Sequence, residues 1–227
     1  MRQRPLMLER KEYGPQRSEM IEKQLRRRGI HDGLVLAAMT AVPRHEFVPE
    51  ELRSQAYEDV PLPIGSGQTI SQPYIVATMT AALHLQPSDR VLEIGTGCGY
   101  QAAVLSRLVK EVFTIERRPE LASAAAATLA RLGYANAHVH CGDGTLGLTE
   151  LAPFDAILVA AAAPAVPKPL LAQLAEGGRM ILPVGDAEHQ ELRLIEKRGD
   201  AFPAKMLEGC RFVPLVGYHG WQEPPKR

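Results

Sequence analysis

The sequence predicts an α/β protein with a Rossmann-like, doubly wound and mostly parallel sheet. Short apolar runs typical of buried strands alternate with longer segments of helical periodicity. The run at residues 90–94 ends in three glycines at alternate positions, and a helical segment follows at once. A second run, at residues 112–116, ends on a carboxylate. Alternation of this kind favours parallel strands joined by crossover helices.

The glycine-rich segment after the first run is the strongest candidate ligand site. Gly95, Gly97 and Gly99 separate the run from a predicted helix at residues 100–110. Glycine adopts positive φ readily, and because it has no Cβ a ligand can lie against the main chain. Open α/β sheets bind ligands at the carboxyl ends of their strands. The glycines alone are equally compatible with a tight strand-to-helix turn that binds nothing.

Glu116 strengthens the ligand interpretation. It lies about 20 residues beyond the first glycine, where an acidic residue meets ribose hydroxyls in Rossmann-like sites. A carboxylate has two oxygens and can accept from both hydroxyls. The alternative is that Glu116 only ends its strand. A nicotinamide cofactor is disfavoured, because its fingerprint is Gly-x-Gly-x-x-Gly and the third glycine here comes one residue too early.

Composition restricts the class of protein further. The chain has 227 residues, 45% of them hydrophobic and 23% charged, which is ordinary for a one-domain globular enzyme. Its balanced charge gives no reason to expect nucleic acid or a membrane as partner. The longest apolar stretch, residues 156–166, is too short to cross a bilayer. Three cysteines without metal-ligand spacing indicate a cytoplasmic protein with no disulfide framework and no metal site.

The amino-terminal region predicts two helices after a flexible start. Residues 1–16 are polar, basic and without pattern, so we expect a flexible terminus. Residues 18–28 have helical spacing, and their arginines are interpreted as a solvated face rather than an anion site. Gly29 ends this helix. Asp32 is placed to cap the next helix, at residues 33–40.

A long segment, residues 42–74, combines prolines and glycines with apolar positions, which predicts a packed irregular loop. The later elements follow from periodicity and breakers, and residues 190–197 are expected to form an antiparallel strand near the sheet edge. The predicted helices are 74–85, 119–132 and 168–174, and the predicted strands are 137–141, 154–160, 179–184, 190–197 and 210–216, with a tail at 217–227.

Two sequence motifs in the long segment resemble those of a known protein family. They are Pro43-Arg44-His45-Glu46-Phe47-Val48-Pro49 and Gly67-Gln68-Thr69-Ile70-Ser71-Gln72-Pro73. Together with residues 91–101 they closely resemble the protein-L-isoaspartate O-methyltransferase family of the S-adenosylmethionine-dependent methyltransferases. The similarity runs from about residue 17 to 216. It implies a single class I methyltransferase domain, with a helical and substrate-loop region at 17–89 and a cofactor-binding sheet at 90–216.

The resemblance also implies roles for particular residues. Ser71 would hold one oxygen of the substrate carboxylate and leave the other to attack, although it could equally cap the following helix. Asp143 would contact adenine, although an Asx turn between glycines is the alternative. The implied cofactor-binding residues are Glu93, Gly95, Gly97, Gly99, Glu116, Asp143 and Gly144, and the implied substrate-binding residues are Ile64, Gly65, Gly67 and Thr69.

The implied reaction is methyl transfer from S-adenosyl-L-methionine to the free carboxylate of isoaspartyl residues in damaged proteins and peptides. S-adenosyl-L-homocysteine is the implied product, and the methyl ester begins repair through a succinimide. A carboxylate is already ionised at neutral pH, so no strong general base is needed. We also expect a monomer, and the cysteine spacing argues against a metal site.

Two other hypotheses remain at this stage. A methyltransferase acting on a small molecule or an RNA base is one, although RNA favours stacking aromatics and the aromatic content is only 5%. A non-catalytic module that keeps the cofactor fold is the other. Retention of Ser71, Glu116 and the glycines argues against the module, and a peptide-methylation assay separates the two.

Overall fold

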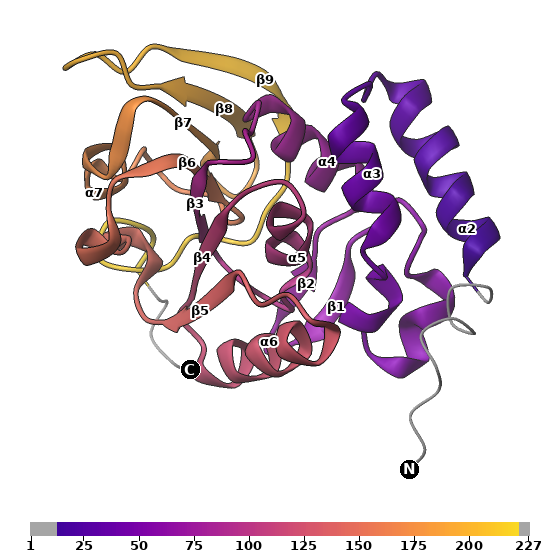
Figure 1. The fold of residues 1–227 in the computed structure, drawn as a ribbon. Coiled ribbons are helices and arrows are strands. Elements are labelled where there is room, and N and C mark those ends of the chain that lie inside the picture. The colour runs from indigo at the N-terminus through magenta and orange to yellow at the C-terminus, as the bar shows by residue number, and fades with distance from the viewer. Residues whose placement is uncertain (1–12, 223–227) are drawn as a thin grey trace.

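The computed structural model describes residues 13–222. Its centre is a seven-stranded sheet in the order β5-β4-β3-β6-β7-β8-β9 (Figure 1). The first five strands of that order are parallel, and β8 and β9 are antiparallel additions at one edge. The strands are β3 (Arg90–Ile94), β4 (Glu111–Glu116), β5 (Ala137–Cys141), β6 (Phe154–Val159), β7 (Leu174–Gly185), β8 (Gln190–Glu196) and β9 (Ala204–Cys210).

Helices cover both faces of the sheet, so the predicted fold class is confirmed. One core cluster packs α3, α4 and α5 against the sheet, and a second cluster on the opposite face includes Leu170 of α7. Figure 1 shows α2, α3 and α4 grouped on one side of the sheet and α7 on the other. The helices are α2 (Gly14–Glu19), α3 (Gly33–Ala41), α4 (Pro73–Ala82), α5 (Tyr100–Ser106), α6 (Pro119–Leu132) and α7 (Lys168–Ala172).

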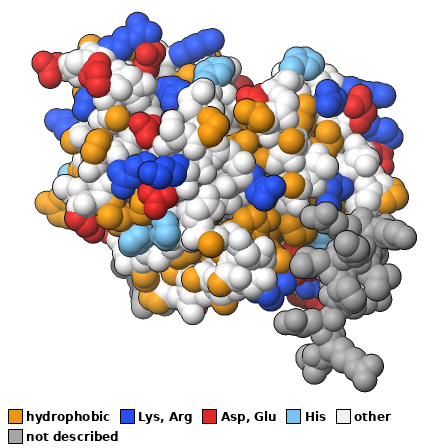
Figure 2. All heavy atoms as spheres, in the orientation of Figure 1, with side chains coloured by type: hydrophobic (Ala, Val, Ile, Leu, Met, Phe, Trp, Pro, Cys, Tyr) orange, Lys and Arg blue, Asp and Glu red, His pale blue; other side chains and the backbone are white. Residues whose placement is uncertain are grey.

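The central strands are apolar because both of their faces are buried. In β6, Ala156, Ile157, Leu158 and Val159 are all fully buried. Parallel strands covered by helices on both sides read as continuous apolar runs of this kind. On the surface, basic and acidic side chains are interspersed over the face drawn in Figure 2. Among the described residues, no helix is long and apolar enough to cross a membrane.

The first amino-terminal helix starts earlier than predicted, whereas the second begins at the predicted residue, Gly33. Helix α2 begins at Gly14, inside the segment expected to be flexible, and continues as a π-type turn (Met20–Leu25) and a 3₁₀ turn (Arg26–Arg28). Residues 1–12 of that expectation lie outside the described residues. The cap of α3 is confirmed, because Oδ1 of Asp32 accepts from the N–H groups of Leu34 and Val35.

The long segment predicted as irregular contains a hairpin. Strands β1 (Leu62–Gly65) and β2 (Gln68–Ile70) pair antiparallel, with Ser66 and Gly67 in positive φ at the turn. The strands are too short for periodicity to reveal them. The rest of the segment forms 3₁₀ turns at Arg44–Phe47 and Glu50–Gln55.

The prediction of a last strand at residues 210–216 is wrong. The edge strand is β9, and the chain beyond Cys210 runs irregularly, with isolated bridges between Pro214 and Ala162 and between Val216 and Trp221. Strand β9 begins with the exposed residues Ala204, Lys205 and Met206. A strand at the edge of a sheet need not carry the apolar alternation on which the prediction relied.

A buried polar network joins the first helix to the long segment. The Tyr57 hydroxyl accepts from Nε of Arg17 at 3.3 Å and from Nη2 at 3.0 Å. A hydroxyl has one proton and two lone pairs, so its proton is left for Nδ1 of His45, 2.8 Å away. Burial lowers the pKa of His45 from its usual 6.5 to about 4. Neutral His45 is therefore part of the folded state.

Replacing His45 should reveal this neutral state as a pH dependence of stability. Because the folded pKa lies below the unfolded one, the contribution of His45 is complete above pH 6.5 and is lost as the pH falls towards 4. We expect the difference in unfolding free energy between wild type and His45→Gln to shrink over that range in urea titrations. His31→Gln, at an exposed position, is the control. A difference independent of pH would contradict the assignment.

Candidate functional site

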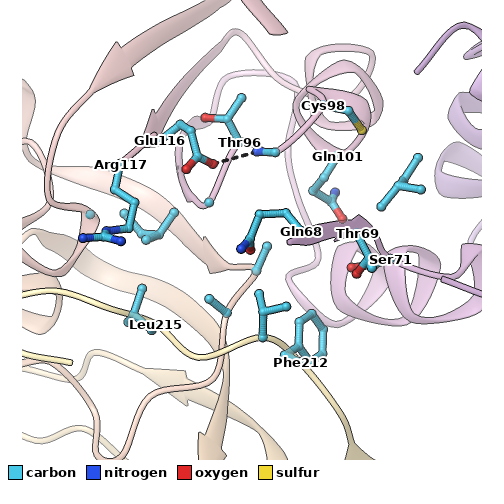
Figure 3. Close-up of a pocket in the computed structure, with 18 of the residues that line it drawn as sticks. Gln68, Thr69, Ser71, Thr96, Cys98, Gln101, Glu116, Arg117, Phe212 and Leu215 are labelled. Atoms are coloured by element: carbon cyan, nitrogen blue, oxygen red, sulfur yellow. Dashed lines mark hydrogen bonds between the residues drawn. The ribbon is translucent and has the colours of Figure 1, made fainter. Parts of the chain in front are cut away.

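A hollow of about 490 Å³ lies at the carboxyl ends of the central strands. The glycine turn after β3 forms its floor, with Gly95 at φ 90°, Gly97 at φ 54° and Gly99 at φ 90°. These left-handed values strain any residue with a Cβ, which explains the glycines. Figure 3 shows Glu116 and Arg117 on one side of the hollow, Thr69 and Ser71 on the other, and Gln68 between.

The Glu116 carboxylate joins the end of β4 to the glycine turn. Oε2 accepts from the N–H of Gly97 at 3.0 Å, and Oε1 accepts from the N–H of Arg118 at 3.1 Å (Figure 3). The side chain lines the hollow and is held by main-chain groups on both sides. Each oxygen keeps a further lone pair for a ligand hydroxyl.

A pair of threonines, which sequence analysis missed, supports the same turn. Oγ1 of Thr96 and Oγ1 of Thr114 are 2.6 Å apart and buried. The N–H of Gly95 also donates to the carbonyl of Ile115 at 2.9 Å. The turn is thus bonded to β4 at three successive residues, 95–97. Alternation along β4 places Thr114 and Glu116 on one face, which was the signal available in the sequence.

The segment after β5 brings Gly144, but not Asp143, to the hollow among the described residues. A Cβ on Gly144 would lie 2.5 Å from Cγ2 of Ile94, so glycine is required for this approach. Asp143 turns away: Oδ1 accepts from the N–H and hydroxyl of Thr145, and Oδ2 from the N–H of Tyr218. Although burial opposes ionisation, these hydrogen bonds lower the pKa of Asp143. This is the geometry of the Asx-turn alternative.

Residues 212–222 form a C-terminal strap that closes the hollow. Residues 212–216 line it, including Phe212 and Leu215 in Figure 3. The strap is anchored by the N–H of His219 on Oγ1 of Thr145 and by Nε1 of Trp221 on the carbonyl of Ala162, both at 3.0 Å. Gly217 packs on Asp143 so closely that a Cβ would lie 2.1 Å from Oδ1.

Glu93 lies behind the turn and not among the described residues that line the hollow. It is fully buried, and neither carboxyl oxygen has a hydrogen-bond partner among the described residues. Burial raises the pKa of Glu93 to about 8, and the nearby charge of Glu116 adds to the effect. The side chain is therefore mostly protonated at neutral pH.

Ser71 stands where two hollows meet. A second hollow of about 500 Å³ adjoins the first, and both are lined by Thr69, Ser71, Ala160, Phe212 and Val213. The interpretation of Ser71 as a helix cap is wrong, because the N-cap of α4 is Gln72 and no side chain caps that helix. Within residues 13–222 the Ser71 hydroxyl has no hydrogen-bond partner, so it is free for a ligand.

The other predicted substrate residues occupy the β1–β2 hairpin. Thr69 lines both hollows, whereas Ile64, Gly65 and Gly67 are not among the described residues that line either. Cδ1 of Ile64 lies 3.2 Å from the position of a Cβ on Gly97, so Ile64 buttresses the glycine turn. Gly65 and Gly67, at φ 91° and 68°, allow the hairpin to reverse.

A Rossmann-like sheet, a left-handed glycine turn after its first strand and a carboxylate after its second define an S-adenosylmethionine-dependent methyltransferase of class I. The model of the protein-L-isoaspartate(D-aspartate) O-methyltransferase family matches residues 15–220. The chain belongs to that family.

Individual relatives agree with this membership. The chain is 58% identical over 206 residues to protein-L-isoaspartate O-methyltransferase 1 of Syntrophobacter fumaroxidans, covering 91% of this chain and 96% of the relative. A solved protein-L-isoaspartate O-methyltransferase is 32% identical, with a TM-score of 0.81 over 90% of this chain and 67% of that one. A β-aspartate methyltransferase from Plasmodium falciparum, solved with S-adenosyl-L-homocysteine, is 28% identical, with a TM-score of 0.78 over 88% and 98%.

The residues present fit S-adenosylmethionine. The volume of the first hollow lies within the range of small-molecule sites, about 300–1,000 Å³. Its floor carries no Cβ at Gly95 or Gly97, and an oriented carboxylate at Glu116 offers the acceptors that a ribose diol requires.

Removing the Glu116 carboxylate should weaken cofactor binding. Hydrogen bonds to charged groups contribute about 1.5–3 kcal/mol each, so Glu116→Ala should raise the Kd for S-adenosylmethionine by at least about tenfold in calorimetry. Glu120→Ala, at an exposed glutamate on the first turn of α6, is the matched control. An unchanged affinity in Glu116→Ala would mean that Glu116 only ends its strand.

The strap can be tested at Gly217. In Gly217→Ala the new Cβ would clash with Oδ1 of Asp143 and displace residues that line the hollow. We expect a several-fold loss of S-adenosylmethionine affinity, with Gly33→Ala as control because a Cβ there meets nothing within 4 Å. Wild-type affinity in Gly217→Ala would show that the strap does not close the site.

Proposed function

We propose that the protein transfers a methyl group from S-adenosylmethionine to the free α-carboxylate of isoaspartyl residues in proteins and peptides. One observation carries the proposal: the unpartnered hydroxyl of Ser71 lies at the junction of the two hollows. A cofactor in the first hollow and a peptide in the second would meet there. The names of the relatives supply the isoaspartyl substrate.

The junction contains no ionisable side chain among the described residues shared by both hollows. Two hydroxyls, from Thr69 and Ser71, stand beside the apolar Ala160, Phe212 and Val213. A carboxylate, with an ordinary pKa of about 3.5, needs no base to become a nucleophile. The site therefore suits an acid substrate better than an alcohol or an amine, which would require a proton acceptor.

The chain's contribution is orientation and exclusion of water. The Ser71 hydroxyl donates to one oxygen of the substrate carboxylate and leaves the other free to attack, and Thr69 offers a second donor beside it. Bound S-adenosylmethionine supplies an electrophilic methyl group on a sulfonium. The apolar part of the junction lowers the local dielectric and strengthens attraction between the opposite charges before transfer.

For the cofactor, we assign direct contacts to Gly95, Gly97, Glu116 and Gly144, all of which line the first hollow. Gly99 does not line it and instead lets the turn pack against Leu129 of α6. Glu93 and Asp143 take supporting roles in this proposal, Glu93 behind the glycine turn and Asp143 as the anchor of the strap. Ile64, Gly65 and Gly67 act on the substrate side by shaping the hairpin that presents Thr69.

We further propose that the protein works as a cytoplasmic monomer, with residues 17–216 as one methyltransferase domain. The three cysteines are free thiols, which fits a reducing compartment. Charge balance gives no support to a nucleic-acid substrate.

The decisive experiment compares a matched peptide pair, isoaspartyl against normal aspartyl, by formation of a base-labile methyl ester. We expect wild type to methylate only the isoaspartyl peptide. Ser71→Ala should lower kcat at least about tenfold, because one positioned hydrogen bond to a charged group is lost, while calorimetry finds S-adenosylmethionine binding unchanged. Thr78→Ala, on α4 away from both hollows, is the control. Unchanged turnover in Ser71→Ala would remove Ser71 from the mechanism.

A further inference from the structure

The second hollow has a wall that the methyl-transfer site does not use. Beyond the five shared residues, it is lined by the carboxyl end of β9 and the chain just after it, including Glu208, Cys210 and Arg211. The opposite wall carries Arg28 and Tyr74. If the first hollow holds the cofactor, residues flanking the reacting isoaspartyl group must lie between these walls.

Glu208 is the one carboxylate among the described residues of this hollow. Its Oε1 is shielded from solvent and has no hydrogen-bond partner among residues 13–222. The side chain as a whole is half-buried and lines the hollow. It forms no ion pair or hydrogen bond among the described residues, so its carboxylate is available to a cationic group of a bound peptide. Burial raises the pKa of Cys210, two residues along the strand, to about 11, and the charge of Glu208 raises it further.

The two cations that line the hollow, Arg28 and Arg211, are less able than Glu208 to bind a charged group of a peptide. Arg28 is committed, because its guanidinium pairs with Asp59 and lies 3.4 Å from the ring centroid of Tyr74. Arg211 is exposed at the rim, where solvent screens its charge. Glu208 is half-buried and unpaired among the described residues, so solvent screens its charge less than that of Arg211.

We infer that Glu208 is a specificity-determining residue for the acceptor: it binds a lysine or arginine side chain next to the isoaspartyl residue. This inference rests on the proposed function and adds a charge preference to it. Charge-assisted hydrogen bonds between ammonium or guanidinium and carboxylate are about twice as strong as neutral ones. Peptides with a flanking glutamate would instead meet a like charge.

The preference is measured with three isoaspartyl peptides that differ only in one flanking residue, lysine, glutamine or glutamate. For wild type we expect kcat/KM to be about tenfold higher with lysine than with glutamate, mainly through KM, as one charge-assisted contact implies. In Glu208→Gln the ratio should fall to about one while kcat at saturation stays the same. Glu208→Asp keeps the charge and should keep most of the preference.

Glu191→Gln is the matched control. Glu191 lies on β8 opposite Gly209 of β9, pairs with Arg193, and is not among the described residues lining either hollow. We expect its ratio to equal that of wild type. A ratio unchanged in Glu208→Gln, or lost equally in Glu208→Asp, would overturn the inference.

The native cysteines provide a readout that does not require turnover. Cys210 lines the second hollow, Cys98 lines the first, and Cys141 is exposed and lines neither among the described residues. With S-adenosylhomocysteine present, the lysine peptide should slow maleimide labelling of Cys210 but not of Cys141. In Glu208→Gln, equal protection should need about tenfold more lysine peptide, in line with the kinetic ratio.

Failure of the proposed function and failure of the inference about Glu208 give different results. If wild type methylates none of the three isoaspartyl peptides, the proposed function is wrong. If it methylates them but the lysine peptide leaves Cys210 labelling unchanged, the acceptor does not occupy the second hollow and the inference alone is wrong. The affinity of each variant for S-adenosylmethionine reports whether it is folded, because Glu208 does not line the first hollow.

Discussion

The hydrogen bond from the N–H of Gly97 to Glu116 is the constraint on which the site depends. It requires β3 and β4 to be parallel neighbours, with Ile94 beside Ile115, so that both strands end at one level. It also requires a left-handed backbone at the turn, which only glycine adopts without strain. The same bond therefore closes the turn and orients the carboxylate. A sheet with these strands separated would have neither.

Around this centre, the two ends of the described chain build the walls. The β1–β2 hairpin presents Thr69 from before the sheet, and the C-terminal strap returns after its last strand. Asp143 joins the strap to the segment after β5 by accepting from the main chain of both Thr145 and Tyr218. The glycines of the strap permit this contact, since Gly217 and Gly220 leave no room for a Cβ.

The parts of the site that depend on local pattern could be predicted from the sequence. The Asp32 cap, the glycine turn and the position of Glu116 follow from spacing and backbone chemistry, and the structure has each of them. Features that depend on contacts between residues far apart in the sequence could not be predicted. The role of Asp143 as an anchor depends on Tyr218, 75 residues away. The absence of a cap at Ser71 depends on where the helix begins: α4 starts at Pro73, so its N-cap position falls on Gln72.

The choice of a hydroxyl at the junction follows from what a carboxylate nucleophile requires. An arginine or lysine there would pair with the carboxylate in the ground state, and that pairing would have to be weakened before attack. A hydroxyl replaces part of the lost hydration at one oxygen and leaves the negative charge available on the other. Apolar neighbours at Ala160, Phe212 and Val213 then keep water from competing. In the inferred arrangement, the residue that recognises a charge on the peptide is Glu208 on β9, at the sheet edge. There it can select the flanking residue without stabilising the nucleophile.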